Sequence, residues 1–358
     1  MKNRRTCGPC GPGKMKKIIK KIACAALAVS LFVTCAGCQK TESSSSPLVN
    51  FFVSLDDDEI IKIEGTVCSL EEAMIVLMSY QNEYKDILGD DGWETQIGDQ
   101  SVREYVLECA KSDLSAIYAF CAMAGEYEIE LDEDELEAAD SAADEYFVSL
   151  NEDETGYAGA SEEDAEALFE SVYLAAKTYE SLADEYTETQ ISDETARVAE
   201  IQYAFVTDEE TAQYIYETAQ DEYQDFLLLA QMYSEDETNE IDLKRGDMTD
   251  EFEEAAFALD DGQISEIISA DGGYYIIKCE TSYLEDETAA NKALLTETAR
   301  QESVSAIYEE FLDGASSIFN SGVWENIEFS ENENVTSTEF NEILSDVFSG
   351  VTGEASGE

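Results

Sequence analysis

Cysteine offers the first candidate chemistry in this chain, because two cysteines separated by two residues can form a redox dithiol. Cys7-Gly8-Pro9-Cys10 has that spacing. A thioredoxin-like site, however, needs a strand before the motif and a helix after it. The motif instead precedes a basic and then apolar segment, and Met15 is the more natural start. We therefore expect residues 1–14 to be a start-site overcall and the dithiol spacing to be a coincidence.

Cys38 has the surroundings of a modification site. Four lysines at 16–21 precede an apolar run at 22–33, and Ala36-Gly37 stand directly before Cys38. This order is typical of a secretory signal peptide, and the apolar run is too short for a stable membrane span. The small residues before Cys38 resemble the lipobox of bacterial lipoproteins, although Cys35 stands where that motif usually has Leu. The resemblance implies a signal peptide at 15–37 and lipidation of Cys38; the alternatives are an ordinary cleaved signal and a signal anchor.

Histidine is absent from the chain. Its absence excludes Ser-His-Asp and Cys-His catalysis and the usual histidine-containing zinc sites. The acidic runs at 56–59 and 132–135 carry the charge of a calcium loop, but the second lacks the glycine turn and the downstream Glu of an EF-hand. Solvated charge is the favoured interpretation of both runs. We expect no metal and no cofactor.

The charge of the chain is strongly negative. Residues 1–37 hold 8 of the 20 basic residues and none of the 82 acidic ones, so the chain from Cys38 onward carries a charge of −70. This charge argues against nucleic acid or an anionic membrane surface as a partner. A hydrophobic content of 44% is that of a folded protein. We expect one or two domains.

Four further cysteines follow Cys38, at positions 68, 109, 121 and 279. Cys109 and Cys121 lie among apolar residues with helical spacing, so buried free thiols are the favoured interpretation. A disulfide is an alternative outside the cytoplasm, and spacing alone does not pair these cysteines.

The first half of the chain has the pattern of a helical domain. A Ser-rich tether at 38–50 precedes a predicted strand at 60–68. Ser69-Leu70-Glu71-Glu72 is a capping box that opens a helix to about 88. Further helices are predicted, with Asp132 capping the second of them, at 102–124, 133–150 and 162–186. The pattern predicts a helical core with acidic, solvated outer faces.

The periodicity changes at about Val198. A strand is predicted at 198–206, and Thr207-Asp208-Glu209-Glu210 reads as a second capping box. Helices follow at 209–221, 223–233 and 252–259. Two strands, 263–268 and 274–281, are separated by the hairpin signal Asp271-Gly272-Gly273. The predicted order is therefore β-α-α-α-β-β.

This order and its residues resemble a parvulin-type peptidyl-prolyl isomerase domain. The segments that carry the resemblance are Ile201–Val206, Ala230–Asp236, Arg245-Gly246-Asp247 and Phe252–Lys278. Together with the signal and the helical half, the chain resembles the PrsA/SurA class of extracytoplasmic foldases. That resemblance implies an α+β fold, in which N- and C-terminal segments build a helical, SurA N-terminal-like chaperone domain around an inserted parvulin-like domain.

The resemblance also implies domain boundaries. The chaperone domain would take 51–195 and 284–330, and the parvulin-like domain 196–283. A helix at 288–319 and a strand at 323–329 would pack back on the N-terminal half, with the strand pairing with 60–67. The polar, Glu-rich segment 331–358 is expected to be disordered.

Site residues follow from the resemblance position by position. Phe252 and Met248 would line the proline pocket, with Phe257 in the core. Asp236 falls at the family's Cys/Asp position, while Tyr203 and Tyr275 replace both family histidines. A Tyr203–Asp236–Tyr275 network would be a modified active site; the alternative is that both tyrosines only fill the core.

The implied function is that of a lipid-anchored foldase on the outer face of the cell membrane, which binds unfolded secreted chains and isomerises X-Pro bonds. The alternative is a non-catalytic chaperone of the same fold. A solute-binding lipoprotein fits poorly, because it would need repeated βαβ units where long helices are predicted.

Overall fold

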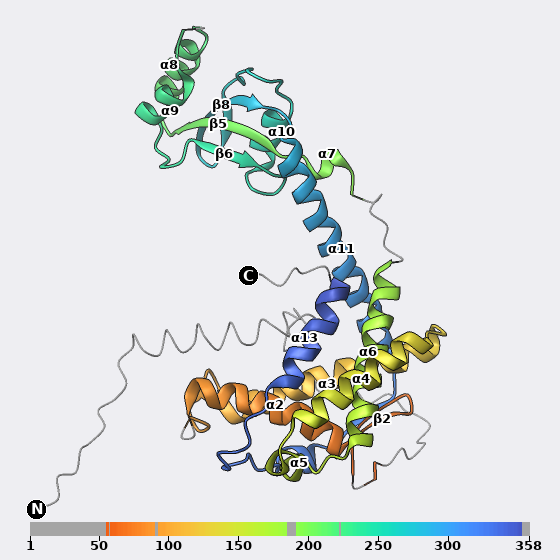
Figure 1. Ribbon diagram of the computed structural model, residues 1–358. Coiled ribbons are helices and arrows are strands. Elements are labelled where there is room, and N and C mark those ends of the chain that lie inside the picture. The colour runs from red at the N-terminus through yellow and green to blue at the C-terminus, as the bar shows by residue number, and fades with distance from the viewer. Residues whose placement is uncertain (1–54, 57, 90–91, 185–190, 222, 353–358) are drawn as a thin grey trace, which may run out of the picture. The chain divides into compact units, whose positions relative to one another are not determined.

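The computed structural model describes residues 55–352 apart from 57, 90–91, 185–190 and 222. Two compact units make up these residues (Figure 1). The helical unit contains residues 55–184 and 302–352, and the sheet unit contains residues 191–301. The predicted signal peptide, Cys38 and the tether to residue 50 lie outside the described residues. None of the described helices combines the length and apolar content needed to cross a membrane.

The helical unit starts with a β-hairpin where the sequence predicted a single strand. Strands β1 (Glu59–Ile63) and β2 (Thr66–Ser69) pair antiparallel. Glu64 and Gly65 join them with φ values of 47° and 96°. Positive φ at both residues is what a two-residue hairpin turn needs, which explains why the chain reverses here.

Helices form most of this unit, and their starts follow the predicted caps. The Ser69 hydroxyl accepts the Glu72 N–H at 3.1 Å, and the Ser69 N–H donates to the Glu72 carboxylate at 2.6 Å. Asp132 caps a later helix in the same way. The predicted capping box at Ser69 is confirmed. The elements from residue 70 to 184 are α2 (Leu70–Leu88), β3 (Gln96–Ile97), β4 (Gln100–Ser101), α3 (Val102–Glu126), α4 (Glu133–Ser149), α5 (Glu152–Ala158) and α6 (Glu162–Asp184).

A C-terminal strand does pair with the first strand, but it is not the predicted one. Strand β9 (Ser317–Phe319) pairs antiparallel with β1. The predicted strand at 323–329 is wrong, because Asn320 caps the short helix α12 (Ser321–Trp324) by accepting the Val323 N–H at 3.3 Å. Trp324 is buried, and its Nε1 donates to the Leu107 carbonyl at 3.2 Å. Trp324 therefore lies on a short helix, and its side chain fills part of the core of the helical unit.

The prediction that 331–358 is disordered is also wrong for the residues that the structure describes. Helix α13 (Glu339–Thr352) buries Phe340, Leu344 and Phe348. The Phe340 ring lies edge-on to Phe169, with ring centroids 5.8 Å apart. These three residues repeat every four positions, and that spacing forms an apolar stripe on a helix. The helix therefore completes the core of the helical unit.

The sheet unit contains a four-stranded antiparallel sheet in the order β6-β5-β8-β7. The strand predicted at 263–268 is displaced: Ile264 makes a single bridge, and β7 starts at Ile268. Helix α8 is capped by Asp208 instead of Thr207. Strand β6 was not predicted. The elements are α7 (Asp193–Ala196), β5 (Ala199–Val206), α8 (Glu209–Ala219), α9 (Phe226–Tyr233), β6 (Glu240–Leu243), α10 (Asp250–Phe257), β7 (Ile268–Ala270) and β8 (Gly273–Thr281).

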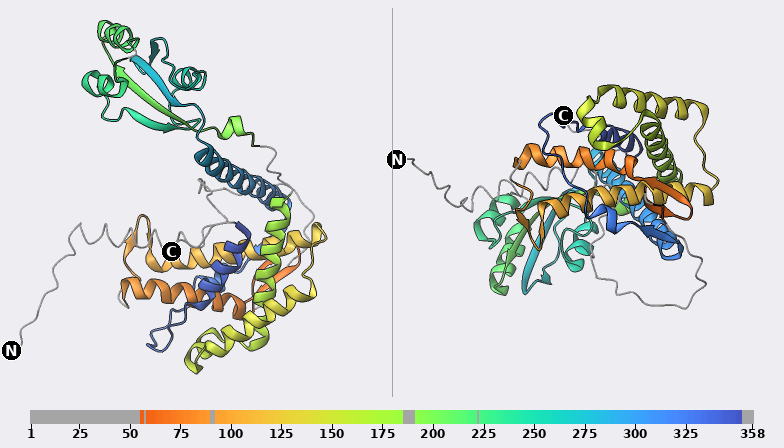
Figure 2. Two further views of the ribbon diagram at one scale, coloured as in Figure 1. Left: turned by 45° about the horizontal axis from the view of Figure 1, so that its top comes forward. Right: turned by 90° about the horizontal axis from the view of Figure 1, so that it is seen from below.

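Helices cover both faces of this sheet (Figure 2). Side chains alternate between the two faces of a strand. On β5, Ala204 and Val206 join the core beneath α8 and α9. Ile201 and Tyr203 point to the opposite face and join the core formed with α10. Tyr203 is therefore held by a strand that is buried on both sides.

The sheet unit is longer than the predicted parvulin-like segment at 196–283. Its boundary falls within α11 (Glu285–Gly314), of which residues up to 301 cluster with the sheet unit. The Thr288 hydroxyl accepts the Val198 N–H at 3.0 Å, and the Asn291 amide donates to the Ala196 carbonyl at 2.9 Å. These buried hydrogen bonds attach the start of α11 to the sheet unit. The α+β fold class itself is confirmed.

Candidate functional site

Three aromatic side chains meet on the face of the sheet that α10 covers. The ring centroids of Tyr203 and Phe252 are 5.6 Å apart, and those of Phe252 and Tyr275 are 5.2 Å apart, both edge-to-face. The rings of Tyr203 and Tyr275 are 6.1 Å apart. Edge-to-face contacts at such distances are favourable for aromatic rings. The structure therefore brings together three of the predicted site residues from β5, α10 and β8.

Asp236 reaches this cluster from a loop that is tied to β5. The Ser234 hydroxyl accepts the N–H groups of Phe205 at 3.1 Å and of Asp236 at 3.2 Å. The Glu235 N–H also donates to the Phe205 carbonyl at 2.8 Å. The carboxylate of Asp236 lies close enough to the Tyr203 hydroxyl to contribute, after burial, to the raised pKa of that phenol. The structure thus places Asp236 near Tyr203, on a loop that hydrogen bonds attach to β5.

Tyr275 finds its hydrogen-bond partner in the hairpin turn instead of in Asp236. Its hydroxyl donates to the Asp271 carboxylate at 3.3 Å. Asp271 and Gly272 form a two-residue turn with φ values of 54° and 77°, as the sequence predicted. Gly273 follows, and a Cβ there would lie 2.6 Å from the Phe205 ring. The turn thus places a second carboxylate beside the aromatic cluster.

The hydroxyl groups of both tyrosines remain protonated at neutral pH. Burial, followed by the nearby Asp236 carboxylate, raises the pKa of Tyr203. Burial and then the Asp271 carboxylate raise the pKa of Tyr275 to about 12, with a smaller contribution from Asp236. A phenol is a hydrogen-bond donor below its pKa. Both side chains are therefore hydrogen-bond donors at neutral pH.

Met248 lies beside the cluster in a loop organised by Glu253. This buried carboxylate accepts the N–H groups of Gly246 at 2.7 Å and of Met248 at 3.0 Å. Gly246 has a φ of 94°, which favours glycine. The ring of Phe257 is buried, as predicted, and the Arg245 guanidinium lies over it, 4.5 Å from the ring centroid.

Phe252, which is predicted to line the proline pocket, lies beneath the aromatic cluster in the structure. Phe252 is 0% exposed, because the rings of Tyr203 and Tyr275 pack against it. Tyr203 and Tyr275 are only 6% and 5% exposed. Met248 and Phe205 are half-buried at the edge of the same cluster. In this conformation Phe252 supports the site from beneath, and Met248 and Phe205 offer the more accessible apolar surface.

Three residues of the site were missed by the sequence analysis. Asp271 was assigned only to a turn, and Glu253 only to a helix. Asn239 was not considered, yet it exchanges hydrogen bonds with Tyr203: its carbonyl accepts the Tyr203 N–H at 2.9 Å, and its amide donates to the Tyr203 carbonyl at 3.2 Å. The sequence nevertheless contained a signal for Asp271. Asp271 belongs to the hairpin turn and precedes Tyr275 by four positions, so the two side chains can lie close together where the turn meets the strand.

Other chemistry-bearing groups lie outside this site. Cys68, Cys121 and Cys279 are buried and Cys109 is half-buried, all as free thiols. Among the described residues, the carboxylates close enough together to hold an ion are Asp144, Glu162 and Glu166. These differ from the two acidic runs weighed for calcium, and exposed acidic groups commonly gather without an ion.

Comparison with known proteins identifies the segment that contains the site. Residues 202–281 match the family described as a PPIC-type PPIASE domain, or rotamase. Foldase protein PrsA 3 of Bacillus anthracis is 38% identical over 98 residues, covering 26% of this chain and 34% of the relative. Foldase protein PrsA of Caldanaerobacter subterraneus subsp. tengcongensis is 41% identical over 109 residues, covering 29% of this chain and 34% of the relative. The match thus spans about a third of the length of each relative.

A solved structure is also similar to this chain. Peptidylprolyl isomerase PrsA from Bacillus cereus is 21% identical, with a TM-score of 0.37, over 71% of this chain and 99% of that one. The family match and the curated relatives confirm the resemblance to PrsA-type parvulin foldases. The sheet unit contains a peptidyl-prolyl isomerase domain of the PPIC, or parvulin, type.

Proposed function

We propose that this protein is an exported foldase whose sheet unit isomerises X-Pro bonds in unfolded secreted chains. The observation that supports the proposal most strongly is the grouping of Tyr203, Tyr275 and Asp236 over Phe252 inside a domain of the matching family. The four side chains come from β5, β8, the loop after α9, and α10. The two phenols and the carboxylate provide hydrogen bonding, and the half-buried side chains of Met248 and Phe205 at the edge of the cluster provide contact with proline.

The reaction requires rotation about a bond with partial double-bond character. The barrier is about 18–20 kcal/mol, and spontaneous rotation takes roughly tens to hundreds of seconds. No covalent bond needs to break. A catalyst must hold the proline ring against an apolar surface and bind the twisted amide more tightly than the planar one.

The side chains suggest a role for each group. The planar amide places partial negative charge on its oxygen, so the Asp236 carboxylate near that oxygen would favour the twisted form, in which this charge is smaller. Tyr203 is the positioning residue that holds Asp236. The Tyr275 hydroxyl lies 3.3 Å from Asp271, a long hydrogen bond that is readily exchanged for one to the amide nitrogen. Met248 and Phe205 would contact the proline ring, with Phe252 supporting them.

The proposed location is the outer face of the cell membrane, with a lipid on Cys38. The basic, apolar and small-residue segments before Cys38 support this location. The partners would be unfolded or newly secreted polypeptides. The charge of −70 from Cys38 onward supports protein clients over nucleic acid.

The burial of Phe252 favours a second candidate function. With Phe252 fully buried and both tyrosines at most 6% exposed, the domain could serve as scaffold for a chaperone that binds clients without isomerising them. The rate of cis–trans exchange in short peptides with Ala, Lys or Glu before proline distinguishes the two. Acceleration by the full chain supports the isomerase. Suppressed aggregation of an unfolded client, without acceleration of any peptide, would support the chaperone alone.

A further inference from the structure

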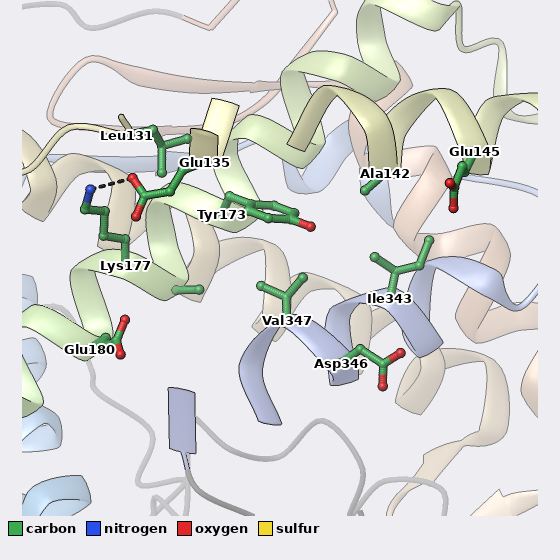
Figure 3. A pocket seen from close by; sticks show the side chains of 11 residues that line it. Leu131, Glu135, Ala142, Glu145, Tyr173, Lys177, Glu180, Ile343, Asp346 and Val347 are labelled. Carbon is green, nitrogen blue, oxygen red and sulfur yellow. Dashed lines mark hydrogen bonds and ion pairs between the residues drawn. The ribbon is translucent and has the colours of Figure 1, made fainter. Parts of the chain in front are cut away.

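A groove in the helical unit lies between α4, α6 and α13 (Figure 3). Its volume is about 470 Å³, within the range of roughly 300–1,000 Å³ that is usual for ligand sites. Tyr173, Ile343 and Val347 give it an apolar floor, and all three side chains are half-buried. None of these residues belongs to the isomerase domain.

Helix α13 presents the floor of the groove because its other face is anchored. Phe340, Leu344 and Phe348 are at most 3% exposed. Ile343 and Val347 are four residues apart, so they lie on one face of the helix, directed into the groove (Figure 3). The floor is therefore held in place by the core beneath it.

Carboxylates surround this apolar floor. Glu145 on α4 and Glu180 on α6 line the groove and are exposed. The basic side chain that lines it, Lys177, forms an ion pair with Glu135. In Figure 3 the apolar side chains lie between Glu145 on one side and the Lys177–Glu135 pair with Glu180 on the other. The lining therefore has an excess of negative charge around an apolar centre.

We infer that this groove binds an extended segment of an unfolded chain in which apolar side chains alternate with Lys or Arg. The apolar side chains would cover Tyr173, Ile343 and Val347, and the cations would face Glu145 and Glu180. Charge complementarity favours this partner over an acidic segment. The inference rests on the proposed function, since it takes an unfolded exported chain as the partner, but it places that partner at a site separate from the proline site.

The test uses the full chain and a fluorescent twelve-residue peptide of alternating Leu and Lys, with a Leu–Glu peptide of equal length for comparison. Fluorescence anisotropy should show the Leu–Lys peptide binding and the Leu–Glu peptide binding at least tenfold more weakly. Glu145→Gln with Glu180→Gln should weaken Leu–Lys binding roughly fivefold, since exposed charge pairs contribute modestly. Val347→Gln should weaken it as well, by removing apolar contact at a half-buried position.

Glu137→Gln with Glu170→Gln is the matched control. It removes the same charge from exposed positions on the same two helices, outside the groove, and binding should stay within about twofold of the wild type. Equal weakening by both double variants would overturn the inference, because attraction by the whole acidic surface would then explain binding. No binding of the Leu–Lys peptide would overturn it too. Exchange of a short Ala-Pro peptide, measured on the same samples, tests the isomerase separately.

Discussion

At the scale of single residues, the central proposal is that Tyr203 and Tyr275 stand where the PrsA/SurA class of foldases has histidines. A histidine near its ordinary pKa of about 6.5 changes charge near neutral pH. Tyr203 and Tyr275 both have raised pKa values and remain neutral donors. The Tyr203–Asp236 pair then keeps one protonation state of the phenol over the range in which a histidine would titrate.

Tyr203→Phe tests the pair directly. The substitution keeps the ring against Phe252 but removes the hydroxyl that lies near Asp236. If this hydroxyl positions Asp236, as proposed, kcat/KM for an Ala-Pro peptide should fall about tenfold, the effect of losing a hydrogen bond to a charged group. Tyr274→Phe is the matched control, because Tyr274 is packed in the core on the opposite face of the sheet. Equal activity of Tyr203→Phe and the wild type would remove Tyr203 from the mechanism.

Asp113 on α3 gives a second residue-scale prediction, this time for stability. Its carboxyl group accepts a hydrogen bond from Tyr80, and burial raises its pKa to about 7. Because the folded pKa exceeds the unfolded value, the folded state favours the protonated form. The stabilisation is complete below about pH 4 and is lost as the pH rises through 7.

Asp113→Asn should therefore raise the free energy of unfolding by about 2 kcal/mol at pH 8, and the gain should shrink toward pH 4. Urea unfolding followed by tryptophan fluorescence measures this change in the helical unit, where both tryptophans, Trp93 and Trp324, lie. Asp86→Asn, at an exposed position of α2, should change stability by less than about 0.5 kcal/mol. If the gain in the free energy of unfolding did not depend on pH, the result would contradict the raised pKa of Asp113.

At the scale of elements, the helical unit depends on its last helix. Helix α13 comes from a segment with many Glu, Asn and Ser residues, yet its apolar stripe fills the core between α2, α4 and α6. Burial of a large apolar side chain contributes about 1.5–3 kcal/mol. The helix is therefore a structural part of the unit.

Phe340→Ala should lower the free energy of unfolding of the helical unit by about 3–5 kcal/mol, because it leaves a cavity beside Phe169 and Tyr146. The measurement is again urea unfolding by tryptophan fluorescence. Glu342→Ala, exposed on the same helix, should shift stability by no more than about 0.5 kcal/mol. A small effect of Phe340→Ala would restore the idea of a disordered C-terminal segment.

The sequence predicted correctly those elements whose form depends on a few neighbouring residues. The cap at Ser69 and the turn at Asp271 were predicted because side-chain and backbone preferences of a few residues define them. Strand β6, with the short sequence Glu-Ile-Asp-Leu, was missed because it is held by pairing with β5. The disorder assigned to α13 followed from composition, which outweighed a stripe of three apolar residues. For the site, Tyr203, Asp236, Tyr275 and Phe252 were predicted to lie together, whereas the partner of Tyr275 and the burial of Phe252 depend on tertiary packing.

At the scale of the whole molecule, one end of the chain differs from the rest in charge. Basic residues concentrate before Cys38, and the remainder carries −70. A chain of this charge is repelled by an anionic membrane surface. Retention at such a surface would therefore need a covalent lipid anchor, and Cys38 is its proposed site. A second membrane-binding signal, or further contacts with the membrane, would strengthen such an anchor.

Cys38→Ala should move the protein from the membrane fraction to the soluble fraction of the producing cells. Cys35→Ala is the matched control, since it changes a cysteine of the same segment three residues earlier and should leave the protein with the membrane. Immunoblotting of the two fractions measures the distribution. Membrane retention of Cys38→Ala would favour the signal anchor over the lipid.

The most direct test of the isomerase proposal is exchange NMR of an Ala-Pro peptide with a catalytic amount of the full chain. Wild-type protein should accelerate cis–trans exchange, and the rate should stay level between pH 6 and 9 because the chain has no histidine and both phenols titrate higher. Asp236→Asn should reduce the acceleration at least tenfold, in line with the loss of a charged hydrogen-bond partner, while Glu237→Gln in the same loop should not. No acceleration by the wild type, or full activity of Asp236→Asn, would contradict the proposed mechanism.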